Sequence, residues 1–254
     1  MMKRVRPVAN ESSAVKRLKV LAMIPTFNER ENVALLIEEV LALSDDFGVL
    51  VVDDDSPDGT AEAVERLAER DPDRVFLLLR KEKRGRGYAG IAGFIEATRR
   101  DPEFVVEMDA DFSHRPSYIP QFLEAIGDAD IVIGSRGVRG GDQVGRSLVR
   151  KIITRLANGY IMAVLGIYGH DLTSGFRLFR TAALKRLALD KMISTGPEVV
   201  QEVLCLAQQH GLKIVEHPIV FWDRSAGEST FNWRIALHSL AWMWRFRFKY
   251  AKGS

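Results

Sequence analysis

Short apolar runs alternate with amphipathic stretches through the first half of the chain. An apolar run of about four to eight residues, closed by turn residues, is typical of a strand buried on both faces. We therefore expect strands at Val20–Ile24, Val49–Val52, Val75–Leu79, Phe104–Met108 and Ile131–Ile133. The stretches between them predict helices that end near Leu43, Arg70, Arg100 and Ile126, the first with Asn28 as its N-cap. This alternation requires parallel strands joined by helical crossovers, so the predicted fold is α/β, a Rossmann-like, mostly parallel sheet flanked by helices.

The second half of the chain has apolar helices and fewer strands. Helices are predicted at Leu148–Leu165 and Pro197–His210, and strands within Leu172–Arg180 and Leu212–Val220. No linker rich in Pro, Gly or Ser separates the two halves, so we expect one compact domain over 19–230. A basic arm over 1–18 precedes it, and an amphipathic C-terminal helix over 231–254 follows it.

Composition narrows the class of protein. The 254 residues are enough to bury the core of one domain. A net charge of +2 gives no global basic field, which argues against a nucleic-acid partner. The single cysteine excludes an intrachain disulfide and fits a reducing compartment. No run of about 18 apolar residues is present, and the N-terminal segment lacks the apolar region of a secretory signal. We therefore expect the protein in the cytoplasm or on the cytoplasmic face of a membrane.

Acidic residues follow the fourth predicted strand, at the end where ligands bind in open parallel sheets. Asp109 and Asp111 are two apart, and such residues point to the same side of extended backbone. Two carboxylates placed in this way repel each other unless a cation lies between them, and Mg²⁺ commonly shares its ligands with phosphate oxygens. We predict a metal site here, with Ser113 as a further oxygen ligand. The alternative is a solvated turn with helix-capping acids.

Residues at the ends of the first two strands predict a nucleotide pocket. Asp53 and Asp54 can accept hydrogen bonds from a base or a ribose. Pro25 and Phe27 can wall the pocket, and Glu29 can pair with a base or ribose group. The alternatives are turn chemistry for the two aspartates and charge complementarity with a helix N-terminus for Glu29.

Two cationic segments are candidates for binding phosphate. Arg136 follows the fifth strand, and Arg150 and Thr154 lie four residues apart on one face of the next helix. Arginine guanidinium groups match phosphate oxygens in shape and charge. The glycine-rich loop from Lys81 to Gly87 lacks the spacing of a Walker A motif, and a solvated basic loop describes it equally well.

The last 24 residues, from Phe231 on, combine aromatic and cationic side chains and contain no acid. This composition suits a helix at a bilayer interface, where rings and long cationic side chains lie at headgroup depth. It suits equally a core helix packed on the sheet, or a dimer interface. The sequence leaves these alternatives open.

Several motifs carry a resemblance to a known family. They are Ile24–Asn32, Val51–Thr60, Glu107–His114, Ile133–Arg136, Asp171–Arg177 and Arg224–Ser229. Through them the chain, from about Val20 to about Trp233, resembles glycosyltransferase family 2. Within that family it is similar to the dolichyl- or polyprenyl-phosphate mannose synthases, in the short soluble class without transmembrane helices.

The resemblance implies a GT-A fold, GDP-mannose as donor, Mg²⁺ or Mn²⁺ as cofactor and a membrane polyprenyl (dolichyl-type) phosphate as acceptor. The site residues that it implies are Pro25, Phe27, Glu29 and Asp53 or Asp54 for the nucleotide, Asp109 and Asp111 for the metal, Arg136, Arg150 and Thr154 for the phosphates, and Arg224 from a mobile loop. Of these we expect Asp111, Arg136, Arg150 and Arg224 to be the catalytic ones. The C-terminal helix would contact the membrane peripherally, or a membrane-anchoring partner subunit or a homo-oligomer would supply that contact.

The expected reaction is attack of an acceptor phosphate oxygen on the sugar C1, with inversion and departure of GDP. A phosphate monoester is already anionic near neutral pH, because its second pKa is roughly 6, so no general base is required. His114 is the only near candidate for such a base. Three alternatives stay open: a transferase of the same fold with a UDP-sugar donor or a saccharide acceptor, a nucleotidyltransferase, and a non-catalytic subunit that binds lipid or a partner.

Overall fold

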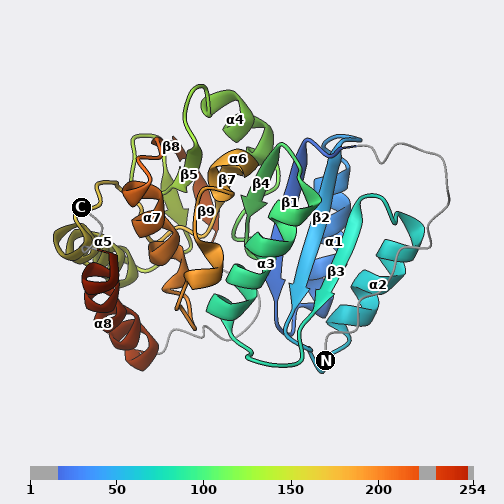
Figure 1. The fold of residues 1–254 in the computed structure, drawn as a ribbon, viewed down its shortest axis with the longest axis horizontal. Coiled ribbons are helices and arrows are strands. Elements are labelled where there is room, and N and C mark those ends of the chain that lie inside the picture. Colours follow the sequence, from blue (N-terminus) through green and yellow to red (C-terminus); the bar gives the residue numbers. More distant parts are fainter. Residues whose placement is uncertain (1–16, 223–232, 251–254) are drawn as a thin grey trace.

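A computed structural model of the chain describes residues 17–222 and 233–250. Its main sheet contains β1 (Val20–Thr26), β2 (Phe47–Asp53), β3 (Val75–Leu79), β4 (Phe104–Glu107), β5 (Ile131–Ser135), β7 (Arg177–Arg180) and β8 (Ile214–Pro218). They are ordered β3-β2-β1-β4-β7-β5-β8 (Figure 1). Strand β7 runs antiparallel to β4 and β5, and every other neighbouring pair is parallel. The predicted α/β, mostly parallel sheet is confirmed.

Helices cover both faces of this sheet. On one face pack α1 (Arg30–Leu41), α2 (Thr60–Arg70) and α4 (Tyr118–Ala125). The opposite layer holds α3 (Arg86–Arg100), α5 (Leu148–Leu165), α6 (Thr181–Leu184), the 3₁₀ turn η1 (Leu189–Lys191), α7 (Val199–Gln209) and α8 (Trp233–Tyr250). Strand β1 sends Val20, Ala22 and Ile24 into the first layer and Leu21 and Met23 into the second. Burial on both faces explains why the strands are continuous apolar runs.

A second, two-stranded parallel sheet was not predicted. It pairs β6 (Asp142–Val144) with β9 (Val220–Trp222). The single strand predicted at Leu212–Val220 is in fact two, because β8 ends at Pro218 and β9 begins at Val220. Strand β6 is short and polar, and its partner lies far away in the sequence. Local hydrophobic pattern therefore gives no signal for it.

The start of α1 differs from the prediction. The N-cap position is Glu29, not Asn28, and its side chain makes no capping hydrogen bond. The first amides of the helix are satisfied by the neighbouring loop instead: the Glu29 N–H donates to Thr60 Oγ1 at 3.0 Å, and the Arg30 N–H donates to Asp58 Oδ2 at 3.1 Å. The predicted cap at Asn28 is wrong because tertiary contacts supply the acceptors.

The C-terminal helix α8 packs on the domain through one face. Trp242, Met243 and Phe246 are buried in the core layer that contains α5 and α7. Arg247 Nη1 donates to the Val164 carbonyl at 2.7 Å, which ties α8 to α5. The outer side of the helix exposes Trp244. The inner face of α8 thus packs in the core, which is one of the alternatives that the sequence left open. No helix in the part of the chain that the structure describes is long and apolar enough to cross a membrane.

The glycine-rich loop before α3 packs closely on another backbone segment. Gly87 donates its N–H to the Thr195 carbonyl at 3.2 Å. A Cβ at Gly87 would lie 2.6 Å from the Thr195 carbonyl carbon and 2.7 Å from the Gly196 nitrogen. The segment it meets is held by a buried glutamate, since Glu198 Oε1 accepts from the Thr195 and Gly196 amides. Gly87 therefore serves backbone packing.

We expect Gly87→Ala to lower the free energy of unfolding by about 1–3 kcal/mol, the usual range for overpacking a close contact. Gly159→Ala is the matched control, because a Cβ at this position in α5 meets nothing within 4 Å. The control should instead raise the free energy of unfolding by up to about 1 kcal/mol through helix propensity. Urea unfolding measures both. Equal stability of Gly87→Ala and the wild type would contradict the assigned contact.

Candidate active site

Parallel pairing brings the ends of β1, β2 and β4 to one edge of the sheet. Thr26 lies opposite Asp53, and Met23 lies opposite Glu107. The Asp54 N–H continues the ladder by donating to the Thr26 carbonyl at 3.2 Å. The loops that carry the predicted nucleotide and metal residues therefore start from neighbouring positions.

Asp53 is fully buried and is held inside the protein. Its Oδ2 accepts from the hydroxyls of Thr26 and Ser56, both at 2.7 Å, and its Oδ1 accepts from the Ser56 N–H at 2.8 Å. This carboxylate joins the loop after β2 to the end of β1. The oxygens of Asp53 therefore organise the loop that follows β2.

Asp54 is also largely buried and lies among cationic and amide donors. It forms an ion pair with Arg80, and its Oδ2 accepts from the Gly85 N–H at 2.6 Å. Burial raises the pKa of Asp54 above its ordinary value, although the Gly85 amide and Arg80 oppose the shift. Through these contacts Asp54 fixes the loop between β3 and α3 beside the end of β2.

The loop after β1 presents one large apolar side chain to solvent. Phe27 is 53% exposed, while Pro25 is half-buried in the strand before it. Glu29 is half-buried, and its Oε2 accepts from Asn32 Nδ2 at 3.0 Å. An exposed ring at a strand end is available to stack on a planar ligand such as a base.

Asp109 and Asp111 lie on the loop after β4, both half-buried. Phe112, between Asp111 and Ser113, has φ = 59°, a left-handed conformation that is uncommon for a phenylalanine. This turn brings Ser113 back onto Asp111: the Ser113 N–H donates to Asp111 Oδ1 at 3.1 Å, and its hydroxyl donates to the same oxygen. Ser113 is buried and orients Asp111.

His114 is buried beneath this loop and is neutral. Its Nδ1 accepts from the Asp109 N–H at 3.2 Å, so the ring proton lies on Nε2. Burial lowers the pKa of His114, although Asp109 and Asp111 favour the charged form. The ring stacks on Phe176 with 5.0 Å between centroids. A buried ring held in this way is not placed to act as a general base.

The donor set at β4 fits a hard divalent cation. Asp109 and Asp111 supply carboxylate oxygens, which Mg²⁺ and Mn²⁺ prefer. Among the described residues, no group of three or more His, Cys, Asp or Glu side chains could hold a metal. A cation at this loop would therefore take its remaining ligands from water or from a diphosphate, which is the usual arrangement for Mg²⁺.

Arg86, at the start of α3, reaches the same group of carboxylates. Its Nη2 donates to Glu107 Oε1 at 2.8 Å and lies 3.5 Å from Asp109 Oδ1. Burial lowers the pKa of Arg86, but Glu107 and Asp109 outweigh it and the net shift is upward. Arg86 thus holds Asp109 in position. Arg177, a second cation that interacts with Glu107, is fully buried, and burial lowers its pKa to about 10.

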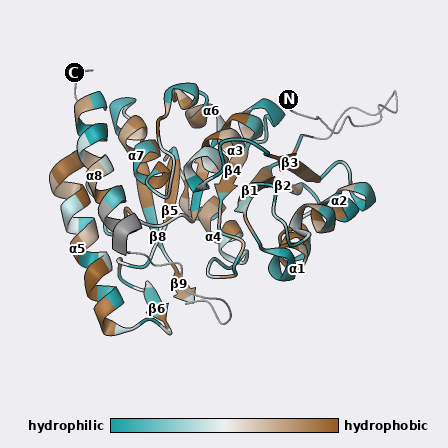
Figure 2. Cartoon of the chain, turned by 90° about the horizontal axis from the view of Figure 1, so that it is seen from below, coloured by the Kyte–Doolittle hydropathy of each residue, from teal (hydrophilic) through white to brown (hydrophobic). Residues whose placement is uncertain are grey.

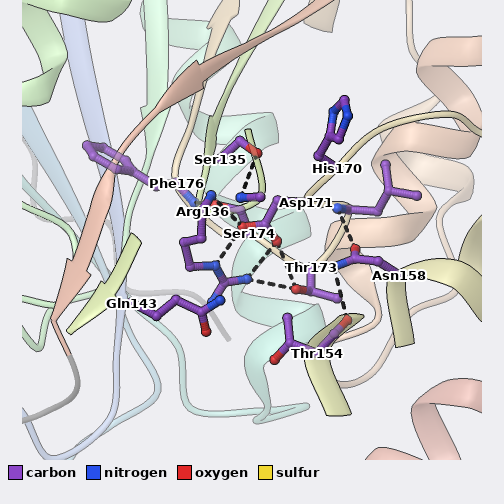
Figure 3. A network of polar contacts seen from close by, with 12 residues as sticks. Ser135, Arg136, Gln143, Thr154, Asn158, His170, Asp171, Thr173, Ser174 and Phe176 are labelled. Carbon is purple, nitrogen blue, oxygen red and sulfur yellow. Dashed lines mark hydrogen bonds and ion pairs between the residues drawn. The ribbon is translucent and has the colours of Figure 1, made fainter. Parts of the chain in front are cut away.

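Arg136, at the end of β5, is fixed by a buried acid (Figure 3). Its Nε donates to Asp171 Oδ2 at 2.6 Å, and its Nη2 donates to Asp171 Oδ1 at 2.7 Å and to Thr173 Oγ1 at 2.8 Å. Burial would raise the pKa of Asp171, but the hydrogen bonds and charge of Arg136 outweigh it and lower that pKa. This bidentate pair sets the guanidinium plane.

Aromatic rings connect Arg136 to the aspartate loop. The guanidinium of Arg136 lies 5.1 Å from the centroid of Phe221, and that of Arg146 lies 5.5 Å from the same ring. The ring of His114 also packs against Phe221, with 5.8 Å between the two ring centroids. His114 in turn contacts Asp109. A chain of contacts through His114 and Phe221 therefore connects Asp109, a predicted metal ligand, to Arg136, a predicted phosphate ligand.

Thr154, on α5, is tied to the same cationic group. Its Oγ1 accepts from Arg146 Nη1 at 3.1 Å and donates to the Arg150 carbonyl at 3.0 Å. Arg150 lies one turn earlier on the helix and is half-buried. Arg146 belongs to the same basic segment as Arg136 and Arg150, for which the sequence predicts phosphate binding.

A cavity of about 830 Å³ lies beside α5. Its lining combines Arg136 and Thr154 with the apolar side chains of Leu148, Ile152 and Met162. Cationic and hydroxyl groups thus share one cavity with hydrocarbon. Such a lining suits an amphiphile that carries a phosphate. Arg224, predicted on a loop over the site, lies outside the described residues.

Comparison with known proteins assigns the family. Residues 22–188 match the model described as "Glycosyl transferase family 2". The chain belongs to this family.

Two relatives of this transferase cover nearly its whole length. It is 39% identical over 240 residues to polyprenol monophosphomannose synthase of Mycolicibacterium smegmatis, covering 92% of this chain and 91% of that protein. It is 41% identical over 212 residues to undecaprenyl-phosphate mannosyltransferase of Micrococcus luteus, covering 84% and 87%. The resemblance to the polyprenyl-phosphate mannose synthases of glycosyltransferase family 2 is confirmed.

The fold of this transferase is found in solved structures. One similar structure is a mannosyltransferase from Pyrobaculum calidifontis in complex with GDP-Man and Mn²⁺, with a TM-score of 0.52 and 23% identity. The match covers 86% of this chain and 60% of that one. At this identity the likeness shows the fold, and it confirms the expected GT-A architecture.

Sequence reasoning missed the residues that hold this transferase's site in place. Glu107 was included in an apolar strand, and Arg86 in a loop for which phosphate binding and a solvated basic loop both stayed open. An acid inside an otherwise apolar run was the available signal, because a fully buried carboxylate requires a buried cation nearby. Asp171 lies in one of the matched motifs, but its partner could not be inferred without the antiparallel course of β7.

We expect Asp171→Asn to lower the free energy of unfolding at pH 7 by about 3–5 kcal/mol, because Arg136 would stay buried without its counter-charge. The folded-state pKa of Asp171 is depressed. The ion pair therefore stabilises the wild type above the unfolded pKa of about 4, and that contribution is lost as the pH falls through the folded pKa. The difference between variant and wild type should shrink below pH ~4.

Urea unfolding at pH 7 and at pH values below 4 measures this difference. Asp128→Asn is the control, because Asp128 is 87% exposed and pairs with Lys213 at the surface. It should show no comparable loss at pH 7. A deficit in Asp171→Asn that stays constant over the whole pH range would contradict the role assigned to the charge of Asp171.

Proposed function

We propose that this protein transfers mannose from GDP-mannose to a polyprenyl (dolichyl-type) monophosphate at a membrane surface, with inversion and with Mg²⁺ or Mn²⁺. The observation that carries the proposal is the chain of contacts through His114 and Phe221, which links the Asp109 side of the site to the Arg136 side. One side suits a cation on a diphosphate, and the other suits a second phosphate. The names of the two relatives support the sugar and the class of acceptor.

The donor nucleotide would lie over the ends of β1 and β2. In this proposal Phe27, 53% exposed, stacks on or walls the base, with Pro25 beside it. Glu29 would accept from a base or ribose group. Asp53 and Asp54 would act mainly by fixing the loops around the nucleotide, since their oxygens already accept from Thr26, Ser56 and Gly85.

The diphosphate would lie at the loop after β4. Asp109 and Asp111 would hold the divalent cation, which when bound neutralises the negative charge of the leaving diphosphate. Arg86 holds Asp109, and Ser113 holds Asp111 through its N–H and hydroxyl. We therefore assign Ser113 a positioning role in addition to its predicted role as ligand. Carboxylates fixed in this way need little reorganisation during the reaction.

The acceptor phosphate would lie beside Arg136, Arg150 and Thr154. One of its oxygens forms a bond to the sugar C1 while the bond from C1 to the diphosphate oxygen breaks, and the electron pair leaves with GDP. The phosphate is anionic near neutral pH, because its second pKa is roughly 6. A base is therefore unnecessary, in agreement with His114, which is buried and whose Nδ1 already accepts from the Asp109 N–H. The protein's contribution is positioning and charge stabilisation.

Two parts of the proposal concern regions beyond this site. Arg224 would reach the phosphates from the segment outside the described residues. The protein would associate peripherally with the cytoplasmic face of a membrane, alone, as a homo-oligomer or with a membrane-anchoring partner. A polyprenyl phosphate is confined to the bilayer, so transfer to it requires that association.

Removing one aspartate tests the proposal. Asp111→Asn should lower transfer of labelled mannose from GDP-mannose to a polyprenyl phosphate by about 100-fold or more, the usual effect of losing one charge-stabilising group. The fold should survive, because an asparagine Oδ1 can still accept from the Ser113 N–H and hydroxyl. A metal chelator should abolish transfer by the wild type, and added Mn²⁺ should restore it.

Asp128→Asn, at the opposite edge of the sheet, is the control and should transfer at the wild-type rate. Calorimetry with GDP-mannose and with UDP-glucose, each with and without Mn²⁺, identifies the donor. Full activity of Asp111→Asn, or metal-independent transfer, would refute the role given to the aspartate pair. Binding of UDP-glucose in preference to GDP-mannose would refute the donor.

A further inference from the structure

Helix α5 has an exposed apolar stripe that no described part of the chain covers. The stripe consists of Leu148, Val149, Ile152, Ile153 and Leu156, whose exposed fractions run from 42% to 75%. Their spacing of one, three and four residues places them on one helical face. Figure 2 shows hydrophobic colouring on the outer part of α5 near β6, at the edge of the molecule.

This stripe is additional to the face by which α5 packs on the domain. Asn158, Ile161 and Val164 are the buried side chains of the helix, and Asn158 Oδ1 accepts from the Leu172 N–H at 2.8 Å. A helix on the surface of a soluble domain usually has one apolar face and one polar face. Helix α5 instead carries this second, exposed apolar surface in its first half, and a contiguous exposed apolar patch marks an interaction site.

Charge identifies the kind of contact. Helix α5 contains no Asp or Glu. The stripe is bordered by Arg150 on one side and by Lys151 and Arg155 on the other, as their positions on the helix dictate. Lys151 also pairs with Asp142 at 3.3 Å, but both groups are exposed, and such a pair is weak in water. Hydrocarbon flanked by cations is complementary to an anionic bilayer surface.

The stripe is continuous with the cavity beside α5. Leu148 and Ile152 belong to the stripe and also line the cavity, which reaches Arg136 and Thr154. A lipid whose chain lies in a bilayer under the stripe could therefore place its phosphate at the proposed acceptor site without leaving apolar contact. None of the described side chains of α8 lines this cavity.

We propose that the apolar stripe of α5 is the surface by which this protein docks on an anionic lipid bilayer. The inference rests on the proposed function, because docking would give the active site access to an acceptor in the membrane. The bilayer contact itself is measured separately. The stripe enters the headgroup region, and Lys151 and Arg155 beside it contact lipid phosphates.

Vesicle sedimentation tests the docking surface. Val149→Gln, Ile153→Gln and Leu156→Gln, combined in one variant, remove the part of the stripe that does not line the cavity and keep a strong helix former at each position. The wild type should bind vesicles of phosphatidylcholine and phosphatidylglycerol in equal parts, and bind phosphatidylcholine alone far less. The triple variant should lose binding by about tenfold or more, as expected for lost burial of three apolar side chains. Leu35→Gln, an equally exposed site on α1, should bind like the wild type.

Activity with two acceptors separates docking from catalysis. The triple variant should transfer at the wild-type rate to a short-chain, water-soluble prenyl phosphate, and should lose transfer to a long-chain acceptor embedded in vesicles. Failure of the proposed function gives a different result, in which the wild type binds vesicles but transfers to neither acceptor. Wild-type vesicle binding by the triple variant would overturn the docking proposal, as would loss of binding only in Trp244→Ser.

A fluorescence measurement keeps the test valid if the triple variant folds poorly. Cys205 is buried, and burial raises the pKa of its thiol to about 12, so a polarity-sensitive label would react at an introduced exposed thiol. Label on Leu156→Cys should shift to the blue with anionic vesicles, and label on Leu35→Cys should not. A shift at Leu156→Cys that depends on protein concentration and not on lipid would mean that a second copy covers the stripe, and would overturn the proposal.

Discussion

Carboxylates crowd the edge of the sheet where β1, β2 and β4 end, and arginines from the neighbouring loops hold them there. Arg80 pairs with Asp54, Arg86 lies between Glu107 and Asp109, and Asp171 sits against Arg136. Acids so close to one another repel, and the guanidinium groups paired with them offset that repulsion. Each loop that carries an acid is therefore fixed by a cation from another loop, and the shape of the site follows from these pairs.

This arrangement divides the arginines of the site into two kinds. Arg86 directs its Nη2 at Glu107 and Asp109 and so belongs to the framework. Arg136 is held by Asp171 and Thr173, and it also lines the cavity beside α5. A guanidinium fixed before the ligand arrives loses little side-chain entropy on binding. The same ion pair that stabilises the fold therefore prepares the group that we propose meets the acceptor phosphate.

Much of this architecture was predictable from sequence, for identifiable reasons. Strands buried on both faces give continuous apolar runs, which is why β1 to β5 were found near their true positions. Residues two apart after a strand share a side, which is why Asp109 and Asp111 were grouped. The antiparallel β7, the β6–β9 pair and the Arg136–Asp171 bridge depend on segments distant in sequence, for which local pattern carries no signal. Asp53 was predicted to face a nucleotide because its position at a strand end can be inferred from sequence. The three donors inside the protein that its oxygens accept from cannot be inferred in this way.

Helices α5 and α8 show that the composition of a helix does not tell which of its side chains are exposed. Aromatic and cationic residues in α8 suggested a bilayer contact, and the structure divides these rings: Trp242 and Phe246 are buried in the core, while Trp244 and Phe248 are exposed. Helix α5 has fewer rings but leaves five apolar side chains in water. It also carries Thr154, next to the cavity. An α-helix with its side chains is only about 10–12 Å across. If α5 lies on the bilayer, one rigid element therefore fixes the distance between the headgroups and the acceptor phosphate. A polyprenyl phosphate could then reach the sugar while its hydrocarbon chain stays in the membrane.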